Sequence, residues 1–389
     1  MTIHPLPTVL VYRSNLLPRS ETFIKEQVRA YRDWRGLLVG RRMLDQLSLD
    51  GLKTRLIEDG MPGQGILHRL GFVSGLDGLR QERPSLLHAH FGPEAVSANP
   101  IARALRVPMV VTLHGYDITI DRDWWESGKG GGEMRSYPRR LLRIATQPET
   151  HFIAVSDAIK ARAIAYGIAP DKVTTIPIGV DVTRFTPGSV PFSERRPRVL
   201  FVGRLVEKKG CGHLLRAMAV VRARLPDAEL VVAGDGPLRA ELEKLSGELG
   251  GGVRFMGALP PERVKSELDA ARVFCLPSVR AANGDAEGFG LVLLEAQAAG
   301  VPVVSSALGG AREGILHGES GYRVEEGDVE GLADRLSELL ARPGKAAAMG
   351  AAARRFVCAR FDIRDCTRNL ERHYNQLARS HDNEPADVL

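Results

Sequence analysis

The sequence predicts an α/β protein made of two doubly wound domains in tandem. The chain has 389 residues, which is more than one hydrophobic core usually organises. Short β-branched runs alternate with helical stretches, the pattern typical of parallel sheets covered by helices. This alternation stops at a Pro-rich, charged segment, residues 186–197, and restarts at Arg198. Two such domains would hold a ligand in a cleft at the carboxyl ends of their strands.

In the first half, the alternation places each expected strand beside a helical stretch. Helices are expected at residues 21–34 and 157–166. Strands are expected at residues 8–12, 86–88, 109–113, 152–155 and 173–176. We therefore assign residues 1–190 to an N-terminal Rossmann-like domain.

The second half repeats the alternation and ends in helices. Strands are expected at residues 199–202, 229–233, 253–256, 273–276, 301–305 and 321–324. Helices are expected at residues 212–224, 238–249, 261–271, 289–299, 331–341, 345–361 and 363–378. We assign residues 191–360 to a C-terminal Rossmann-like domain, and residues 361–389 to a C-terminal helix with a tail.

The composition is that of a globular protein without a membrane span. The chain is 44% hydrophobic and 26% charged, and we find no signal segment or apolar run long enough to cross a bilayer. The four cysteines lack C-x-x-C spacing, so we expect reduced thiols in a cytoplasmic protein.

The net excess of positive charge, +6, lies wholly in the first half. Residues 1–185 hold 25 Lys and Arg against 19 Asp and Glu, whereas the rest holds 28 of each. An anionic membrane surface, a pyrophosphate-bearing acceptor and nucleic acid would each explain this excess, as would an ordinary solvated surface. Nucleic acid is the weakest of these explanations, because aromatic residues are only 6% and no helix-turn-helix pattern is present.

Two glutamates bracket a glycine-flanked loop that leads into an apolar helix. Glu287 precedes the loop and Glu295 follows it. Carboxylates can accept hydrogen bonds from hydroxyls, while the backbone N–H groups of Gly288, Phe289 and Gly290 can take a phosphate. A ligand with both phosphates and many hydroxyls is a sugar nucleotide. The bare pair of glutamates could equally belong to a solvated helix surface.

A basic loop follows the first strand of the second half. Gly203 and Arg204 come directly after that strand, and Lys209 precedes Gly210 a turn later. Arg binds a diphosphate as a fork and Lys as a point charge, so Arg204 and either Lys208 or Lys209 could hold one diphosphate, and we choose Lys209. A solvated basic turn is the alternative.

Two further strand ends carry candidate ligand groups. Gly234 and Gly236 permit close backbone approach and serve equally well in a tight turn or a ligand loop. Arg239 stands where a dinucleotide fingerprint needs its third glycine, so we exclude that motif. His114 ends a first-half strand and can donate a hydrogen bond to a sugar.

We expect no metal site. His88 and His90 lie two residues apart at one strand end, where further ligands with metal spacing are missing, so we interpret them as part of the cleft wall. Asp121 and Asp123 are best explained as a solvated loop. No P-loop, zinc pattern or nucleophile elbow is present.

Taken together, these motifs make the chain resemble glycosyltransferase family 4, the retaining enzymes of GT-B fold. The resemblance covers nearly the whole length, and its first-half motifs resemble the branch that builds exopolysaccharides of the colanic acid and amylovoran type. The motifs are G-R-L-V-E-K-K-G at 203–210, G-D-G-P-L-R at 234–239, the two glutamates, A-G-V-P-V-V at 299–304, G-G-A-R-E at 309–313, H-G-E-S-G-Y at 317–322, R-S-E-T-F-I at 19–24, H-A-H-F-G at 88–92 and N-G-D-A-E-G at 283–288.

The resemblance implies a GT-B fold, with two domains facing across a cleft and C-terminal helices crossing back to the first domain. In such a fold, residues 1–190 would bind the acceptor and residues 191–360 the nucleotide-sugar donor. It implies that Arg204 and Lys209 hold the donor diphosphate and that His114 contacts the sugar. Glu287 would bond the hydroxyls of the transferred sugar, with the backbone of residues 288–291, through Leu291, beside it. Glu295 would bond the ribose.

The resemblance also implies the reaction. A hexose would move from a UDP- or GDP-linked donor to an oligosaccharide or polyprenyl-pyrophosphate-linked acceptor by front-face substitution, with neither a cofactor nor a metal ion. Such an enzyme could rest on the inner face of the plasma membrane. The loop after the first strand departs from the family pattern, because it lacks the paired glycines found elsewhere.

Two other functions remain open at this point. A sugar-nucleotide epimerase shares the two-domain architecture but should show extra carboxylates for anomeric chemistry, which we do not find. A polysaccharide-assembly scaffold could keep the fold without turnover, although Arg204, Lys209, Glu287 and Glu295 are all present.

Overall fold

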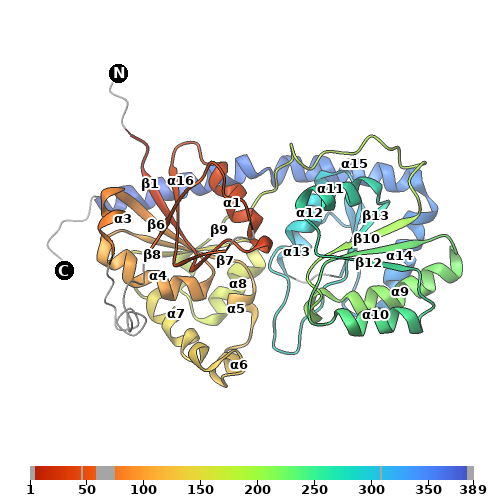
Figure 1. Cartoon of the computed structure of the whole chain (residues 1–389), viewed down its shortest axis with the longest axis horizontal. Coiled ribbons are helices and arrows are strands. Elements are labelled where there is room, and N and C mark those ends of the chain that lie inside the picture. Colours follow the sequence, from red (N-terminus) through yellow and green to blue (C-terminus); the bar gives the residue numbers. More distant parts are fainter. Residues whose placement is uncertain (1–4, 45–46, 58–74, 307–308, 383–389) are drawn as a thin grey trace. The chain divides into compact units, whose positions relative to one another are not determined.

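The protein consists of two compact units, which we describe separately. The structure is a computed structural model that describes residues 5–44, 47–57, 75–306 and 309–382. The first unit comprises Met1–Gly179 together with Ile363–Leu389, and the second comprises Val180–Asp362 (Figure 1). The expected domain boundary at residue 190 thus lies inside the second unit.

The first unit is built on a parallel sheet of seven described strands in the order β5-β3-β1-β6-β7-β8-β9. Its strands are β1 Thr8–Tyr12, β3 Arg35–Gly40, β5 Lys53–Leu56, β6 Pro84–His90, β7 Met109–Leu113, β8 Thr150–Ala154 and β9 Val173–Thr175, with a small parallel pair of β2 Asn15–Leu16 and β4 Arg42–Met43 beside it. Its helices are α1 Thr22–Arg29, α3 Asp77–Gln81, α4 Gly92–Leu105, α5 Tyr116–Thr119, α6 Arg122–Glu126, α7 Tyr137–Ala145, α8 Asp157–Tyr166 and α16 Ile363–Asp382, with short 3₁₀ turns at Arg19–Glu21, Gly132–Met134 and Pro170–Lys172.

Central strands of this sheet are apolar throughout, because helices cover both faces of a parallel sheet. Every residue of β1 and β7 is buried. A core cluster joins β1 residues such as Val9 and Val11 to Ile24 of α1 and Tyr374 of α16.

One expected helix in this unit is wrong in its second half. Helix α1 ends at Arg29, five residues before the expected end at residue 34, and the following Arg35–Gly40 forms strand β3, which the sequence analysis did not predict. The apolar run of β3 pairs with β1 along its length, with Thr8 opposite Arg35 and Tyr12 opposite Val39. This pairing satisfies backbone N–H and C=O groups of β3 that would otherwise be buried without partners.

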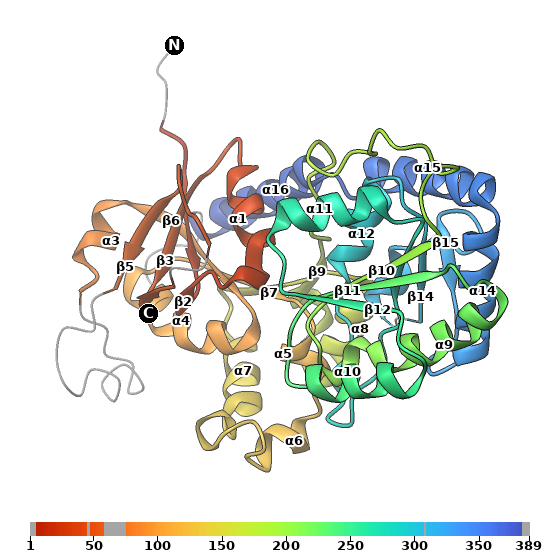
Figure 2. The same ribbon diagram turned by 45° about the vertical axis from the view of Figure 1, so that its right-hand side comes forward.

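The second unit repeats the doubly wound plan with six described parallel strands in the order β12-β11-β10-β13-β14-β15 (Figure 2). Its strands are β10 Arg198–Val202, β11 Glu229–Ala233, β12 Val253–Gly257, β13 Val273–Leu276, β14 Val303–Ser305 and β15 Gly321–Arg323. Its helices are α9 Cys211–Arg224, α10 Arg239–Glu248, α11 Pro261–Ala270, α12 Leu291–Ala298, α13 Gly310–Glu313, α14 Val329–Ala341 and α15 Pro343–Arg360, with a 3₁₀ turn at Glu207–Lys209.

The sequence predicts this half closely, and the helix after the glycine loop is the main difference. Helix α12 begins at Leu291, not at Phe289, because Gly290 adopts a positive φ of 73° as its N-cap. Phe289 is consequently outside the helix, and its buried ring packs edge-on against Phe361. The α/β class and the two doubly wound sheets are confirmed.

The last helix completes the first unit. Glu371 of α16 accepts hydrogen bonds from the backbone N–H groups of Arg32, Asp33 and Trp34, at 2.8, 2.9 and 3.2 Å. These residues form the turn between α1 and β3, so α16 holds the start of β3 in place. The chain therefore returns to its first unit after Asp362.

Each sheet has one point where the strand order reverses. In the first unit it lies between β1 and β6, and in the second between β10 and β13. Loops diverge to opposite faces at such a point, which leaves room for a ligand at the carboxyl ends of the two strands. None of the described helices is both long and apolar enough to span a membrane.

Candidate functional site

The loops after β10 and β13 meet at the reversal point of the second unit. Lys209 follows β10 and Glu287 follows β13, and their Nζ and Oε2 atoms are 2.5 Å apart. The backbone N–H of Val279 donates to the carbonyl of Lys208 at 2.9 Å, which fixes one loop against the other. Residues separated by 78 positions thus form one ion pair.

This ion pair keeps Glu287 ionised. Burial opposes ionisation, but Lys209 and Lys208 outweigh it and lower the pKa of Glu287 below its ordinary value. The Ser278 hydroxyl donates to the same carboxylate at 3.3 Å. An ammonium group has three N–H donors, so Lys209 retains donors for a second anionic group after it binds Glu287.

Arg204 lies at the same edge of the sheet but differs in exposure. Its side chain faces solvent, and the guanidinium makes no hydrogen bond or ion pair to another residue of the described chain. Lys208 is engaged instead, with its Nζ 3.0 Å from Asp285. The exposed guanidinium of Arg204 is therefore available to an incoming anion.

The glycines of this region have demonstrable packing roles. A Cβ on Gly210, which has φ +63°, would lie 1.8 Å from the carbonyl oxygen of Pro277. A Cβ on Gly234 would lie 1.9 Å from the carbonyl oxygen of Gly203, and one on Gly236 would lie 2.4 Å from that of Leu205. Close packing of the loops after β10 and β11 thus accounts for Gly234 and Gly236 without a ligand.

Glu295 lies on α12, one turn after its start. The side chain is partly exposed, and burial of its carboxyl raises the pKa to about 7, an effect that Arg184 partly offsets. A carboxyl group with this pKa changes its charge near neutral pH. It can therefore switch between accepting hydrogen bonds at both oxygens and donating one.

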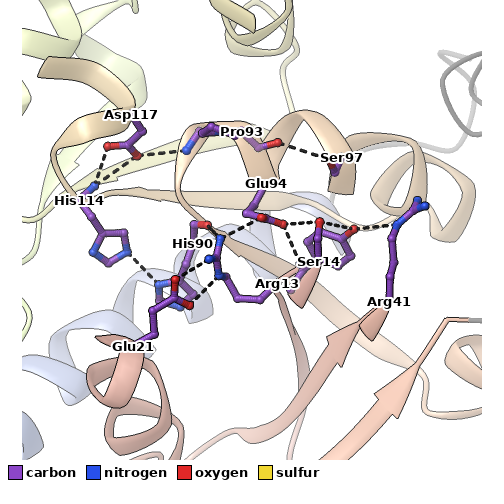
Figure 3. Close-up of polar contacts among 12 residues, drawn as sticks. Arg13, Ser14, Glu21, Arg41, His90, Pro93, Glu94, Ser97, His114 and Asp117 are labelled. Atoms are coloured by element: carbon purple, nitrogen blue, oxygen red, sulfur yellow. Dashed lines mark hydrogen bonds and ion pairs between the residues drawn. The ribbon is translucent and has the colours of Figure 1, made fainter. Parts of the chain in front are cut away.

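A second polar cluster occupies the reversal point of the first unit (Figure 3). Arg13 follows β1 and binds both oxygens of Glu21, at 2.8 Å to Oε2 and 2.5 Å to Oε1. The same guanidinium lies 3.0 Å from Glu94 at the start of α4, and Glu94 accepts from the backbone and hydroxyl of Ser14. The loop that lacks paired glycines thus holds a largely buried arginine between two carboxylates.

Phe91 marks strain at the same place. It joins β6 to α4 with φ 76° and ψ 145°, a conformation that glycine adopts far more readily than phenylalanine. The Arg13 guanidinium lies over its ring at 4.8 Å, and the His114 ring centroid is 4.3 Å away. Strain of this kind persists only where surrounding contacts impose it.

His114 extends from the loop after β7. Asp117 fixes the conformation of this loop. The buried Asp117 carboxylate accepts from the backbone N–H groups of Gly115 at 2.8 Å, Gly92 at 3.1 Å and His114 at 3.2 Å. Burial raises the pKa of Asp117 to about 6 against these hydrogen bonds. Asp117 thereby ties the His114 loop to the start of α4.

The structure thus groups the predicted residues in two places. Lys209 and Glu287 form an ion pair in the second unit, Arg204 follows β10 on the same edge of that sheet, and His114 belongs to the first unit. The sequence reasoning did not single out Arg13, Glu94, Asp117 or Ser278. Arg13 directly follows strand β1 at the reversal point, and this position is the one sequence feature that could have marked it as a candidate site residue.

The described parts of the chain contain no group of three or more His, Cys, Asp or Glu side chains that could hold a metal ion. Asp121 instead forms an ion pair with Arg162, 2.8 Å between Oδ1 and Nη2. His88 bonds to Thr112 and Tyr374.

Two adjoining family profiles match the chain. "Glycosyl transferases group 1" matches residues 183–356 and "Glycosyltransferase Family 4" matches residues 57–184. The GDP-mannose-dependent monoacylated alpha-(1-6)-phosphatidylinositol monomannoside mannosyltransferase of Corynebacterium glutamicum is 33% identical over 277 residues, covering 68% of this chain and 69% of the relative. The amylovoran biosynthesis glycosyltransferase AmsK of Erwinia amylovora is 32% identical, covering 74% of this chain and 69% of the relative.

Solved structures show the same fold. The HepE protein of Anabaena in complex with UDP superposes with a TM-score of 0.77 at 20% identity, covering 95% of this chain and all of that one. The sucrose-phosphate synthase of Thermosynechococcus elongatus gives a TM-score of 0.75 at 21% identity, covering 97% of this chain and 100% of that one.

The family profiles, the relatives and the fold therefore show a glycosyltransferase of the GT-B class. The chain belongs to glycosyltransferase family 4, and its relatives include enzymes of amylovoran and colanic acid biosynthesis, as the first-half motifs indicated. These relatives give no support to the epimerase or scaffold alternatives.

Proposed function

We propose that this glycosyltransferase moves a hexose from a nucleotide-diphosphate sugar to a hydroxyl of a growing oligosaccharide, with retention of anomeric configuration and without a metal ion. The observation that carries the proposal is the Lys209–Glu287 ion pair at the reversal point of the second sheet, with the exposed Arg204 on the same edge. This edge combines cations for a diphosphate with a carboxylate for sugar hydroxyls.

Each residue has a role that fits its surroundings. Arg204 and Lys209 bind the diphosphate, because a guanidinium and an ammonium supply the charge that a divalent cation supplies elsewhere. Glu287, ionised beside Lys209, accepts hydrogen bonds from the transferred sugar. The backbone amides of residues 288–291 face the same ligand, and Glu295 accepts from the ribose hydroxyls.

The reaction proceeds by front-face substitution. As the bond to the diphosphate breaks, Arg204 and Lys209 stabilise the negative charge that develops on the leaving oxygen. The acceptor hydroxyl attacks the same face of the sugar and passes its proton to a phosphate oxygen of the departing diphosphate. Positioning and electrostatic stabilisation supply most of the rate increase.

The acceptor is a lipid-linked oligosaccharide in exopolysaccharide synthesis, and the enzyme works at the inner face of the plasma membrane. Two observations support this part: the excess of Lys and Arg in residues 1–185, and relatives named for amylovoran synthesis and for transfer to a phosphatidylinositol mannoside. Anionic lipid headgroups and lipid pyrophosphates both attract such a basic surface.

The first experiment measures thermal stabilisation of the metal-free protein by UDP, GDP and their hexose conjugates. A ligand that binds only the folded state raises the midpoint temperature of unfolding. At 100 times its Kd, such a ligand adds about 2.7 kcal/mol to the free energy of unfolding. We expect one nucleotide class to act, with a larger shift for one sugar. A folded protein that responds to none of them would contradict the donor site.

The second experiment identifies the product. Incubation of the stabilising donor with a polyprenyl-pyrophosphate oligosaccharide should yield a glycosylated acceptor, and the one-bond coupling between C1 and H1 of the transferred hexose reports its configuration. Excess EDTA should leave the rate unchanged. An inverted product, or a rate restored only by added divalent ions, would refute the corresponding part of the proposal.

A further inference from the structure

Two histidine rings of the first unit share one hydrogen bond. His90 ends β6 and is fully buried, whereas His114 follows β7 and is partly exposed. His90 Nδ1 and His114 Nε2 are 3.0 Å apart, and the rings meet edge to edge with centroids 5.2 Å apart and planes inclined by 26° (Figure 3). One of these two nitrogens must therefore carry the proton and the other must accept it.

Both rings are neutral at physiological pH. Burial lowers the pKa of His90 well below its ordinary value, and His88, His114 and Arg13 lower it further. Burial likewise lowers the pKa of His114, with added repulsion from His88 and Arg13. Each neutral ring has one N–H donor and one acceptor, so the shared bond decides the tautomer of both rings together.

The other ring nitrogen of His90, Nε2, determines which ring donates in the hydrogen bond between His90 and His114. His90 Nε2 is buried and has no hydrogen-bond partner in the described part of the protein. A buried N–H without an acceptor is the rarer and costlier arrangement in folded proteins, whereas an unpaired acceptor is tolerated more often. The proton of His90 therefore belongs on Nδ1, where it has the His114 ring to donate to.

We infer that His90 is a positioning residue that donates from Nδ1 to His114 Nε2 and so fixes His114 as the tautomer with its own proton on Nδ1. His114 then presents an N–H donor to a ligand oxygen and cannot act as a base at that atom. This inference rests on the proposed function in one respect, namely that His114 contacts the sugar.

His88 holds the His90 ring in the required orientation. Its own nitrogens are both engaged, Nε2 with the Thr112 hydroxyl at 2.7 Å and Nδ1 with the Tyr374 hydroxyl at 2.5 Å. The ring centroids of His88 and His90 are 4.2 Å apart. The Arg13 guanidinium also donates to the His90 carbonyl at 3.4 Å, so backbone and ring are fixed from two sides.

Nitrogen NMR of the full-length protein labelled with ¹⁵N-histidine tests the tautomers directly. The His90 and His114 signals are assigned from their absence in His90→Asn and His114→Asn. We expect both rings to carry the proton on Nδ1 between pH 6 and 8, without titration. A proton on Nε2 of His114 would overturn the inference, whether or not the protein transfers sugar.

Matched amide substitutions test the positioning role. The Asn amide nitrogen lies near the place of Nδ1 and the Gln amide nitrogen near that of Nε2, so His90→Asn can keep the donor that His90→Gln misplaces. We expect His114 to stay the Nδ1-protonated tautomer in the Asn variant and to become a mixture in the Gln variant. Turnover should fall about tenfold more in the Gln variant, the loss typical of one hydrogen bond.

The same comparison at His114 separates this inference from the proposed function. His114→Asn should retain more turnover than His114→Gln, because it keeps a donor at the Nδ1 position. If the tautomers are as inferred but both His114 variants transfer sugar at the normal rate, the sugar contact fails and with it the functional part of the inference. Equal losses in His90→Asn and His90→Gln, with His114 unchanged as a tautomer, would contradict the positioning role.

Discussion

At the scale of single residues, Lys209 interacts with two anionic groups, the Glu287 carboxylate and, in our proposal, a donor phosphate. It neutralises Glu287 in the free protein and, in our proposal, also binds a donor phosphate. Lys209→Ala should therefore lower turnover at least 100-fold and also cost about 1–3 kcal/mol of stability, because it leaves a mostly buried carboxylate without its closest cation. Chemical denaturation and donor kinetics measure the two effects separately.

The control for this prediction is a double variant. Lys209→Ala combined with Glu287→Ala removes the unpaired carboxylate and should recover much of the lost stability without recovering turnover. Lys208→Ala, whose partner is Asp285, should leave turnover within a fewfold of normal. A Lys209→Ala protein that is as stable and as active as the parent would show that the pair has neither role.

Glu295 gives the protein a predicted pH dependence near neutrality. Its folded pKa of about 7 lies above the ordinary value of 4.5, so the folded state holds its proton more tightly than the unfolded state. This group therefore stabilises the protein at low pH, and the stabilisation is lost as pH rises from about 4.5 to 7. Glu295→Gln should be more stable than the parent at pH 8 and equal to it below pH 5.

Whereas the contribution of Glu295 to stability falls as pH rises, its contribution to nucleotide affinity should rise. The ionised carboxylate accepts from both ribose hydroxyls, so affinity for the free nucleotide should rise with pH through 7 in the parent. In Glu295→Gln it should be about tenfold weaker at pH 8 and flat with pH. Titration calorimetry at several pH values measures this, and an unchanged pH profile in the variant would show that another group is responsible.

At the scale of elements, the β6–α4 junction stores strain in Phe91. Within a helix or strand, a protein with alanine at a given position is usually about 0.5–1 kcal/mol more stable than one with glycine. At Phe91 we expect the reverse, with Phe91→Gly more stable than Phe91→Ala by about 1–3 kcal/mol, because only glycine adopts φ 76° and ψ 145° without strain. Both variants lose the same ring, so urea unfolding of the pair isolates the backbone contribution.

A matched pair elsewhere on α4 provides the control. Ala102 is buried inside the same helix, and Ala102→Gly should be destabilising in the usual direction. If the Phe91→Ala variant is as stable as the Phe91→Gly variant, or more stable, the β6–α4 junction is not strained.

The elements that the sequence predicted well are those whose pattern is local. Strand β1 and helix α8 have the predicted bounds because an apolar run and helix-compatible spacing can be read within one window. Strand β3 was missed because its run R-G-L-L-V-G follows a helical pattern without a strong stop, and only pairing with β1 defines it as a strand.

The candidate sites divide in the same way. Lys209 and Glu287 were each predicted from a motif, but their ion pair spans 78 residues and depends on the order of strands β10 and β13. The Arg13–Glu21–Glu94 cluster was not predicted, since it forms only when β1 and β6 are neighbours. The hydrogen bond between His90 and His114 likewise requires the pairing of β6 with β7.

At the scale of the whole molecule, the two units differ in how the chain builds them. The second unit is one continuous segment, Val180–Asp362, whereas the first needs α16 from the far end of the sequence. Tyr374 of α16 packs in the first core, and Glu371 binds three backbone N–H groups before β3. Removal of α16 therefore exposes apolar surface of the first core and deprives three backbone N–H groups of their acceptor, and the lost burial is costly.

We accordingly expect the units to behave differently as fragments. Residues 180–362 should fold alone and retain affinity for the donor nucleotide, because this segment contains Arg204, Lys209, Glu287 and Glu295. Residues 1–179 should remain unfolded until a peptide of residues 363–389 is added. A peptide carrying Tyr374→Ala and Glu371→Ala should fail to restore the fold. Circular dichroism and nucleotide titration of the separate fragments measure these outcomes, and a cooperatively folded 1–179 fragment would show that α16 is dispensable for the first unit.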